Sequence, residues 1–178
     1  NRAVLVSSLS SANSVPNVAR TTIVSFPDRH FIAGGCQAYV VGGGTGNVDN
    51  MLVRWSTQED FSVWNPTSTN TAGDQRLQVG TKIIAMVSAR EETIISTDEA
   101  IYGMTFVGGA FVFSFRLLAT NSGAAGLNTM ISVDGNVFWM GKRNFFTYDG
   151  IVKEIPCPVQ HYVFDRMQTR YIDKVVTG

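Results

Sequence analysis

The sequence predicts an all-β protein built from four-stranded antiparallel units of the kind that form the blades of a β-propeller. The first observation is alternation: in Phe113–Leu117, large apolar residues alternate with polar ones at a period of two, which is typical of a strand. The second is turn chemistry, because Asp134-Gly135 and Asp149-Gly150 separate apolar segments, and Asp-Gly favours the positive φ angles of a tight hairpin. The third is repetition: Lys82–Pro158 holds two successive sets of four such segments about 45 residues apart, the spacing of propeller blades.

A third, less regular set precedes these two, so that three blades are expected, at residues 21–79, 82–119 and 128–156. The first blade has two long inner loops, the glycine-rich Gly34–Asn50 and the aromatic-containing Thr57–Asp74. Phe138 and Trp139 lie in a strand that is apolar on both faces, and both are expected in the core. The expected strands are Thr21–Phe26, Arg29–Ala33, Met51–Ser56, Gln75–Val79, Lys82–Ser88, Glu92–Thr97, Ala100–Val107, Phe111–Ala119, Asn128–Val133, Asn136–Met140, Asn144–Tyr148 and Ile151–Pro156.

The two ends of the chain match each other and predict partial blades, at residues 1–6 and 171–178. Ala3–Val6 would be the last strand of a preceding blade and Tyr171–Val176 the first strand of a following one, with a short helical turn at Tyr162–Met167 in the last link. Three blades cannot close a ring, because propellers need about four to eight, and the open ends would expose wide apolar faces. The chain also begins with Asn1 rather than Met. We therefore expect residues 1–178 to be part of one larger propeller domain, in a longer polypeptide.

The composition limits the classes of partner. The chain has 178 residues, 44% hydrophobic and 16% charged, and its 14 basic and 14 acidic residues leave no net charge. A protein that coats DNA needs clustered Lys and Arg, so a broad DNA-binding surface is not expected. No run of about 20 apolar residues could span a membrane. Cys36 and Cys157 lack the spacing of zinc ligands, and buried free thiols are the simpler expectation, with a disulfide left open.

For each candidate catalytic motif, a structural interpretation is favoured over a catalytic one. Gly42–Gly46 follows an apolar segment but lacks the Lys-Ser/Thr of a phosphate-binding loop, so a flexible loop is expected. His30 and His161 lie far apart, and no serine has the Gly-x-Ser-x-Gly context, so structural histidines are expected. Three carboxylate pairs lie at predicted turns, where charged side chains exposed to solvent are the ordinary explanation: Glu59-Asp60, Glu91-Glu92 and Asp98-Glu99. The basic residues at predicted turns are interpreted in the same way; they are Arg90, Lys142 and Arg143. We expect no enzyme, cofactor or metal site.

A series of motifs carries a resemblance to a known family. A strand ending in Arg-Trp-Ser runs into an acidic turn, a Trp-x-Pro step and then an Asn-Thr-Ala-Gly-Asp step into the next strand. The series continues through Ile94–Phe106 and a Tyr-Asp-Gly turn followed by Pro156-Cys157. Over Val53–Phe164 it resembles the tail nozzle proteins of short-tailed bacteriophages, also called packaged-DNA stabilisation proteins, whereas the first fifty residues match poorly. The motif residues are Arg54, Trp55, Ser56, Asp60, Trp64, Pro66, Ala72, Gly73, Asp74, Tyr148, Asp149 and Gly150.

From their chemistry alone, these motif residues are expected to have structural roles. Arg54 is expected to stack on an aromatic ring or to pair with Asp60. Trp64 and Pro66 are expected to plug the edge of the blade, and Gly73 to permit a tight turn into the next strand.

The resemblance implies a structural protein of the virion, located in the phage tail and assembled in the host cytoplasm. Several copies, most simply six, would form a homo-oligomeric ring below the portal and adaptor, in contact with other tail proteins. Double-stranded DNA would pass through the lumen without sequence-specific binding, and the ring would retain the packaged genome until infection. The long loops Gly34–Asn50 and Thr57–Asp74 are the expected contacts with neighbouring subunits or tail proteins.

Two other functions remain open from the sequence. One is a receptor-binding or general protein-interaction propeller, which would lie at the far tip of the tail rather than at the portal. The other is a propeller enzyme that acts on host glycans, which would place two carboxylates about 5–10 Å apart in a concave pocket.

Overall fold

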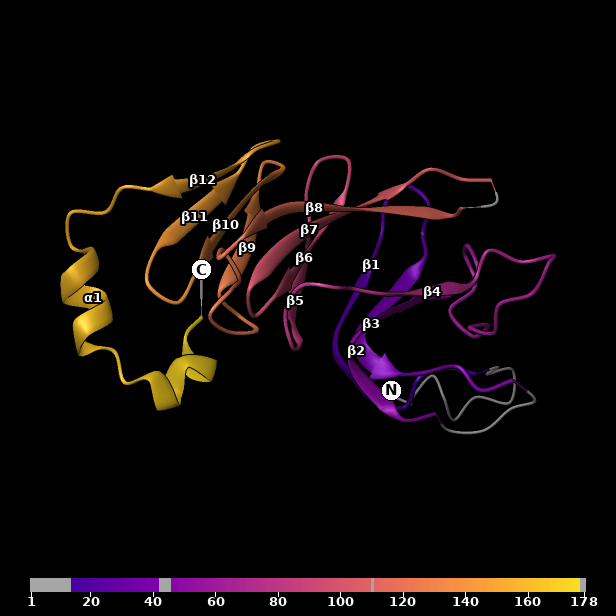
Figure 1. Cartoon of the computed structure of the whole chain (residues 1–178). Coiled ribbons are helices and arrows are strands. Elements are labelled where there is room, and N and C mark those ends of the chain that lie inside the picture. Colours follow the sequence, from indigo (N-terminus) through magenta and orange to yellow (C-terminus); the bar gives the residue numbers. More distant parts are fainter. Residues whose placement is uncertain (1–13, 42–45, 110, 177–178) are drawn as a thin grey trace, which may run out of the picture.

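The computed structural model describes residues 14–41, 46–109 and 111–176, and within them the protein is all-β, with three four-stranded antiparallel sheets (Figure 1). Each sheet takes four strands that are consecutive in the chain: β1–β4 form the first sheet, β5–β8 the second and β9–β12 the third. The predicted all-β class and the three quartets are confirmed. The strands are β1 (Ala19–Val24), β2 (Phe31–Gln37), β3 (Val48–Trp55), β4 (Gly73–Arg76), β5 (Ile83–Ser88), β6 (Thr93–Thr97), β7 (Ala100–Phe106), β8 (Phe113–Thr120), β9 (Met130–Val133), β10 (Asn136–Met140), β11 (Phe145–Tyr148) and β12 (Val152–Ile155).

The turn between β9 and β10 shows how local sequence sets the register. Asp134 and Gly135 both have positive φ, at 51° and 82°, which is the backbone of a tight primed turn. Val133 and Asn136 therefore pair directly across the hairpin, as the Asp-Gly pattern predicts.

The first sheet departs from the prediction at the Gly34–Asn50 loop, which is shorter than expected. β2 continues to Gln37 and β3 already begins at Val48, so the connection is confined to residues 38–47. The reason is a bulge: Gly35 has a φ of 61°, and the pairing register shifts between Gly34 and Cys36, which lets the strand continue past the two glycines. The predicted strand Gln75–Val79 is likewise displaced to Gly73–Arg76, because Gly73 pairs with Trp55.

Two apolar clusters join the three sheets face to face. Ile94 and Ile95 are neighbours in β6 that point to opposite faces, so Ile95 enters the cluster shared with the first sheet and Ile94 the cluster shared with the third. The second sheet is thus buried on both faces. The first cluster contains Ile32, Met51, Val53, Trp55, Tyr102 and Met104, and the second contains Ile84, Ile101, Val137, Trp139 and Tyr148.

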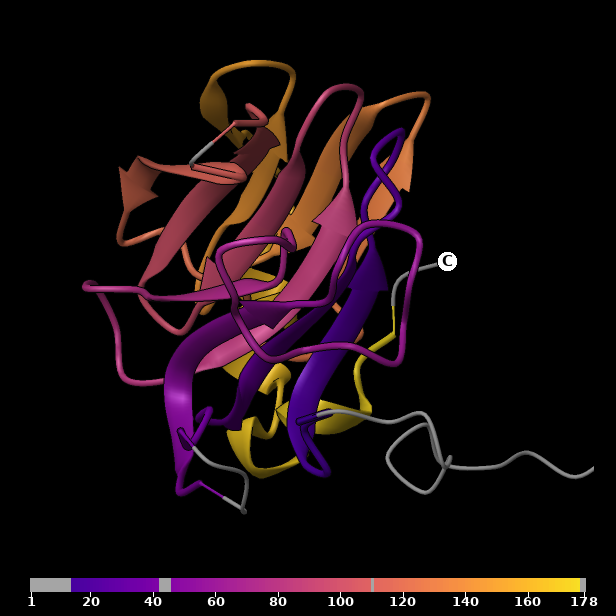
Figure 2. The same cartoon turned by 90° about the vertical axis from the view of Figure 1, so that its right-hand side faces the viewer.

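The sheets approach each other mainly along their first strands. β5 contacts β1 of the first sheet on one side and β9 of the third sheet on the other. Figure 1 shows the three sheets side by side, and Figure 2 views the stack from the side of the first sheet. The expectation that Phe138 and Trp139 both belong to the core is right only for Trp139, because Phe138 is 37% exposed on the outer face of the third sheet.

The C-terminal segment contains two short helices. α1 (Gln160–Arg166) confirms the predicted helical turn. The predicted strand Tyr171–Val176 is wrong, because this segment forms the 3-10 helix η2 (Thr169–Lys174), closed by bonds such as Val175 N to Ile172 O. The described part of the chain offers no strand beside it, so turns three residues long satisfy the backbone instead. The other predicted partial blade, residues 1–6, lies outside the described residues. Neither of these helices has the length and apolar character needed to cross a bilayer.

Candidate functional site

Most of the motif residues come together where β3 ends and β4 begins in the first sheet. They lie at the end of β3, in the loop of residues 57–72 and at the start of β4, so the loop leaves and re-enters the sheet at one place. Trp55 and Gly73 are cross-strand partners, and so are Arg54 and Asp74. The sequence spacing between these pairs is long, but their pairing in the sheet makes them direct neighbours.

Arg54 fixes the loop to the sheet through backbone oxygens. Its side chain is 2% exposed and donates hydrogen bonds to the carbonyl oxygens of Gln37, Ser14 and Trp64, at 3.0, 2.9 and 2.9 Å. Burial lowers the pKa of the guanidinium. The expected partner Asp60 is not involved, since that carboxylate accepts hydrogen bonds from Ser62 instead. Arg54 therefore clamps three separate backbone segments over the outer face of the first sheet.

Trp55 lies on the opposite face of β3, in the core between the first and second sheets. Its indole N–H donates to the Thr71 carbonyl oxygen at 2.9 Å, which fixes the end of the loop. Gly73 packs against the ring, and a Cβ there would lie 2.5 Å from Trp55 Cζ2. The expected role of Gly73, a tight turn, is therefore wrong: its backbone is extended in β4, and the absent side chain makes room for the indole.

Trp64 is the apolar anchor of the loop. It is 5% exposed and packs with Ala33, Cys36 and Leu52 on the outer face of the first sheet, while its indole N–H donates to Phe61 O at 2.7 Å. The ring thus covers part of the outer face of the sheet, whereas the predicted plug would lie at the edge of the blade.

Polar bonds within the loop shape the turns on either side of this anchor. Asp60 accepts from Ser62 N at 2.8 Å and Ser62 Oγ at 2.6 Å, and these bonds lower its pKa. Asn70 Nδ2 donates to Asn65 O at 2.9 Å beside the half-buried Pro66. Ser56 Oγ accepts from Phe31 N at 3.1 Å, which ties the start of the loop to β2.

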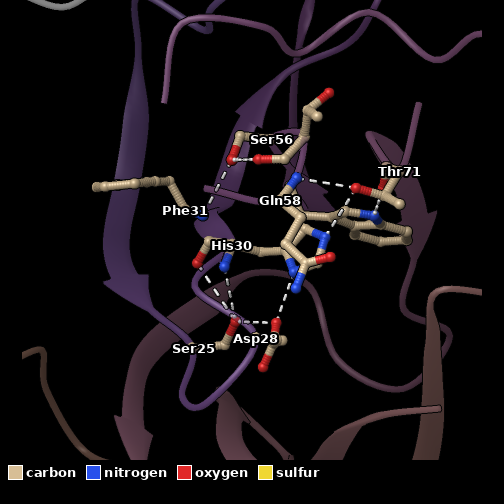
Figure 3. Close-up of polar contacts among 9 residues, drawn as sticks. Ser25, Asp28, His30, Phe31, Ser56, Gln58 and Thr71 are labelled. Carbon is tan, nitrogen blue, oxygen red and sulfur yellow. Dashed lines mark hydrogen bonds and ion pairs between the residues drawn. The ribbon is translucent and has the colours of Figure 1, made fainter. Parts of the chain in front are cut away.

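A buried polar network lies behind this loop and was not predicted as a unit. Asp28 Oδ2 accepts from Ser25 Oγ and from His30 Nδ1, both at 2.6 Å (Figure 3). His30 Nε2 forms a hydrogen bond with Thr71 Oγ1 at 3.0 Å, and the same oxygen accepts the Gln58 N–H at 2.8 Å. The only sequence signal is the clustering of Ser25, Asp28 and His30 around one predicted turn.

The chain of carboxylate, imidazole and hydroxyl has the order of a hydrolase triad. In this protein the imidazole is shielded from solvent: His30 is fully buried, with its ring centroid 5.6 Å from that of Phe106 and 5.0 Å from that of Phe113. The half-buried Thr71 hydroxyl is held between His30 and the Gln58 N–H. The network joins the β1–β2 turn, the loop of residues 57–72 and the second sheet, and a structural role for His30, as expected, is the one its geometry supports.

The remaining motif residues, Tyr148, Asp149 and Gly150, lie elsewhere, at the turn between β11 and β12. The Tyr148 hydroxyl donates to the carboxylate of Glu92, in the turn before β6 of the second sheet, and burial together with that carboxylate raises the pKa of Tyr148 to about 12. Arg116 also bonds Glu92, at 3.4 Å. These residues connect the second and third sheets beside a groove of about 280 Å³.

The other candidate groups remain separate. Glu59 forms an ion pair with Arg29 at the surface, and the Asp98 carboxylate accepts a hydrogen bond from Thr81. The prediction that the carboxylate pairs are exposed to solvent is wrong for Glu92, whose side chain is only 11% exposed. Both cysteines are free thiols. Among the described residues, no three His, Cys, Asp or Glu side chains are grouped so as to hold a metal ion.

No protein-family model matches this sequence, and a search of curated proteins finds no significant match.

Proposed function

We propose that the three sheets are consecutive blades of a β-propeller, and that the protein is a structural component of a phage tail nozzle. The stacking supports the first part: the sheets face one another in chain order, and their first strands lie closest together, as around a propeller axis. The nozzle function follows from the motif resemblance in the sequence.

The observation that carries the proposal is the use made of the motif residues. Four of these residues hold the loop of residues 57–72 against the first sheet: Arg54, Trp55, Trp64 and Gly73. A rigid scaffold that presents a fixed loop suits a ring of subunits, in which loops meet neighbours while the sheets set their position. In this function the ring continues the DNA channel below the portal and adaptor, contacts the DNA without reading its sequence, and retains the genome until ejection.

The test is the position of the protein in the assembled particle. We expect cross-linking mass spectrometry of purified virions to give links from residues 57–72 to a second copy or to a portal-proximal tail protein. Imaging of the same particles should place the protein between the portal and the distal tail. A location at the far tip of the tail would favour the receptor-binding alternative, and absence from the virion would refute the proposal.

A genetic test uses the clamp. Virions that carry Arg54→Met should lose nozzle rings and leak packaged DNA, measured as nuclease-sensitive DNA in filled heads. Arg76→Met, at an exposed arginine of the same sheet, is the matched control and should leave both unchanged. Equal DNA retention in the two variants would count against a genome-retaining role.

A further inference from the structure

A pocket of about 390 Å³ lies near the place where the first strands of the sheets come together. The first sheet contributes Arg20 of β1, and the second contributes Lys82 and Ile84 at the start of β5. The remaining wall comes from Ala125–Leu127, in the link between β8 and β9, and from Ile172 of η2. Figure 1 shows how η2 reaches this place, because the chain turns back toward the sheets after α1.

The apolar wall of this pocket is fixed by contacts within the chain. Gly126 lies so close to η2 that a Cβ there would stand 2.9 Å from Ile172 O. The link itself is held by the buried Thr129, whose hydroxyl accepts from Gly126 N at 3.1 Å and donates to Gly126 O at 2.8 Å. The wall is therefore in place before any ligand enters.

Arg20 is held in one orientation by its neighbours in β2 and β5. Its Nε donates to Ile83 O at 2.8 Å. Its aliphatic part lies over Gly35, where a Cβ would stand 2.5 Å from Arg20 Cδ and 2.8 Å from Cγ. Among the described residues, none forms a hydrogen bond or an ion pair with the terminal nitrogens Nη1 and Nη2. Arg20 is thus a positioned cation whose strongest donors are unused.

Lys82 brings a second cation to the same pocket. Its backbone is fixed by Asp98, since Lys82 N donates to Asp98 Oδ1 at 3.3 Å and Asp98 N donates to Lys82 O at 3.0 Å. The Asp98 carboxylate also accepts from Thr81 N and Thr81 Oγ1, and it forms no ion pair with the Lys82 ammonium group. The described residues that line the pocket include no Asp or Glu, so the two positive charges are not neutralised there.

We propose that this pocket binds a phosphate monoester of the size of a nucleoside monophosphate. With Nε occupied, the two terminal nitrogens of Arg20 can bind two phosphate oxygens side by side, and Lys82 adds a point charge. Two cations match the charge of about −1.5 to −2 that a phosphate monoester carries at pH 7. The pocket also has room for more than the phosphate, because volumes above about 300 Å³ are typical of sites for small organic ligands.

The apolar wall determines the rest of the ligand. Ile84, Leu127 and Ile172 offer no charge and would pack against the sugar or the base, so a nucleotide should bind more tightly than inorganic phosphate. The inference goes beyond the proposed nozzle function and does not depend on it. It is also compatible with a larger propeller, since every contact that carries it lies within the three sheets and the C-terminal segment.

The experiment titrates the isotope-labelled chain with deoxyadenosine monophosphate and follows the backbone amides of Lys82, Leu127 and Ile172 by NMR. Ionic strength is kept constant, so that screening does not change during the titration. We expect saturable shifts at these amides, at lower concentration than with inorganic phosphate. Deoxyadenosine, which has no phosphate, should leave them unchanged. Duplex DNA without terminal phosphates offers only diesters and should not displace the nucleotide.

Variants test the two cations separately. Lys82→Met and Arg20→Met should each weaken the binding of deoxyadenosine monophosphate by about tenfold, because each removes a charged partner of the phosphate. Lys82→Met should leave the fold intact, since the Lys82 side chain forms no hydrogen bond or ion pair with a described residue. Lys153→Met and Arg76→Met are the matched controls: both side chains are exposed and form ion pairs outside the pocket, and both variants should bind as the unmodified chain does.

Three results would overturn the proposal. They are an unmodified chain that does not respond to the nucleotide, equal shifts with deoxyadenosine, and binding that withstands Lys82→Met. Displacement of the nucleotide by duplex DNA would overturn it as well, because the site would then bind phosphodiesters. The nozzle function is tested independently: a chain that binds the nucleotide but is absent from virions would refute the nozzle alone, and a chain at the nozzle that binds no nucleotide would refute the pocket alone.

Discussion

Gly73 lies against the Trp55 indole, so closely that a methyl group on its α-carbon would stand 2.5 Å from Cζ2 of the ring. The two residues are cross-strand partners in β3 and β4. The glycine is needed for this contact and not for backbone freedom, since Gly73 continues the extended strand. The contact sets where β4 begins and therefore where the long loop re-enters the sheet.

Gly73→Ala should destabilise the protein by about 1–3 kcal/mol, because the added methyl forces the indole out of its packed position. Urea unfolding measures the loss. In a Trp55→Leu background the same substitution should cost much less, since the smaller side chain leaves room. Equal costs in the two backgrounds would show that the indole contact is not the cause.

Arg54→Met should be more damaging, by about 3–5 kcal/mol, because it leaves one buried and two partly buried carbonyl oxygens without their donor. Arg54→Lys should recover little, since one ammonium group cannot reproduce the fork of a guanidinium. The exposed Arg76, which pairs with Asp49 at 2.7 Å, gives the control: Arg76→Met should cost no more than about 1 kcal/mol. Similar losses at Arg54 and Arg76 would contradict the clamp.

The sequence predicts the sheets better than the contacts that surround them. Period-two alternation and Asp-Gly turns are local signals, so the three quartets and the β9–β10 hairpin could be located from them. The extent of β2 could not, because a bulge at Gly35 carries the strand through residues that read as a loop. Tyr171–Val176 has strand-like composition, but a strand needs a neighbour to pair with, and here the segment closes on itself as η2.

At the site, too, the sequence indicated which residues belong together but not the contacts between them. The motif indicated that Arg54, Trp55, Trp64 and Gly73 belong together, but not which atoms meet. Arg54 was expected to bind the carboxylate of Asp60 and instead binds carbonyl oxygens, which have no signature in sequence. The His30 network depends on Thr71, 41 positions away, and only folding brings the two together.

Thr71→Val should cost about 1–3 kcal/mol of unfolding free energy, because it leaves His30 Nε2 and the Gln58 N–H without a partner while preserving the shape of the side chain. Thr67→Val, at an exposed threonine of the same loop, is the control and should change stability by less than about 0.5 kcal/mol. A neutral effect of Thr71→Val would mean that the network contributes nothing to holding the loop.

The two thiols should differ sharply in reactivity. Cys36 is fully buried, and burial raises its pKa to about 12, whereas Cys157 is half-buried. Because the thiolate is the reactive form, a disulfide reagent should label one thiol per folded chain quickly and both in denaturant. Cys157→Ser should abolish the fast phase. Fast labelling of Cys36 in the folded protein would show that the outer face of the first sheet opens readily.

Tyr148 should make stability depend on alkaline pH. Its pKa rises from about 10 to about 12 in the folded protein, because burial and the Glu92 carboxylate disfavour the phenolate. The folded state therefore prefers the protonated phenol, and this stabilisation is complete below pH 10 and is lost as the pH rises through 12. Between these values the free energy of unfolding should fall more steeply for the unmodified protein than for Tyr148→Phe.

The Cys36 thiol also titrates late, but it does so in both proteins, so the difference between the two curves isolates Tyr148. Absorbance near 295 nm gives an independent reading. The difference between the unmodified protein and Tyr148→Phe should show a phenolate that appears with a midpoint near pH 12. A midpoint near 10 would mean that Tyr148 is not held against Glu92, and that the link between the second and third sheets is open in solution.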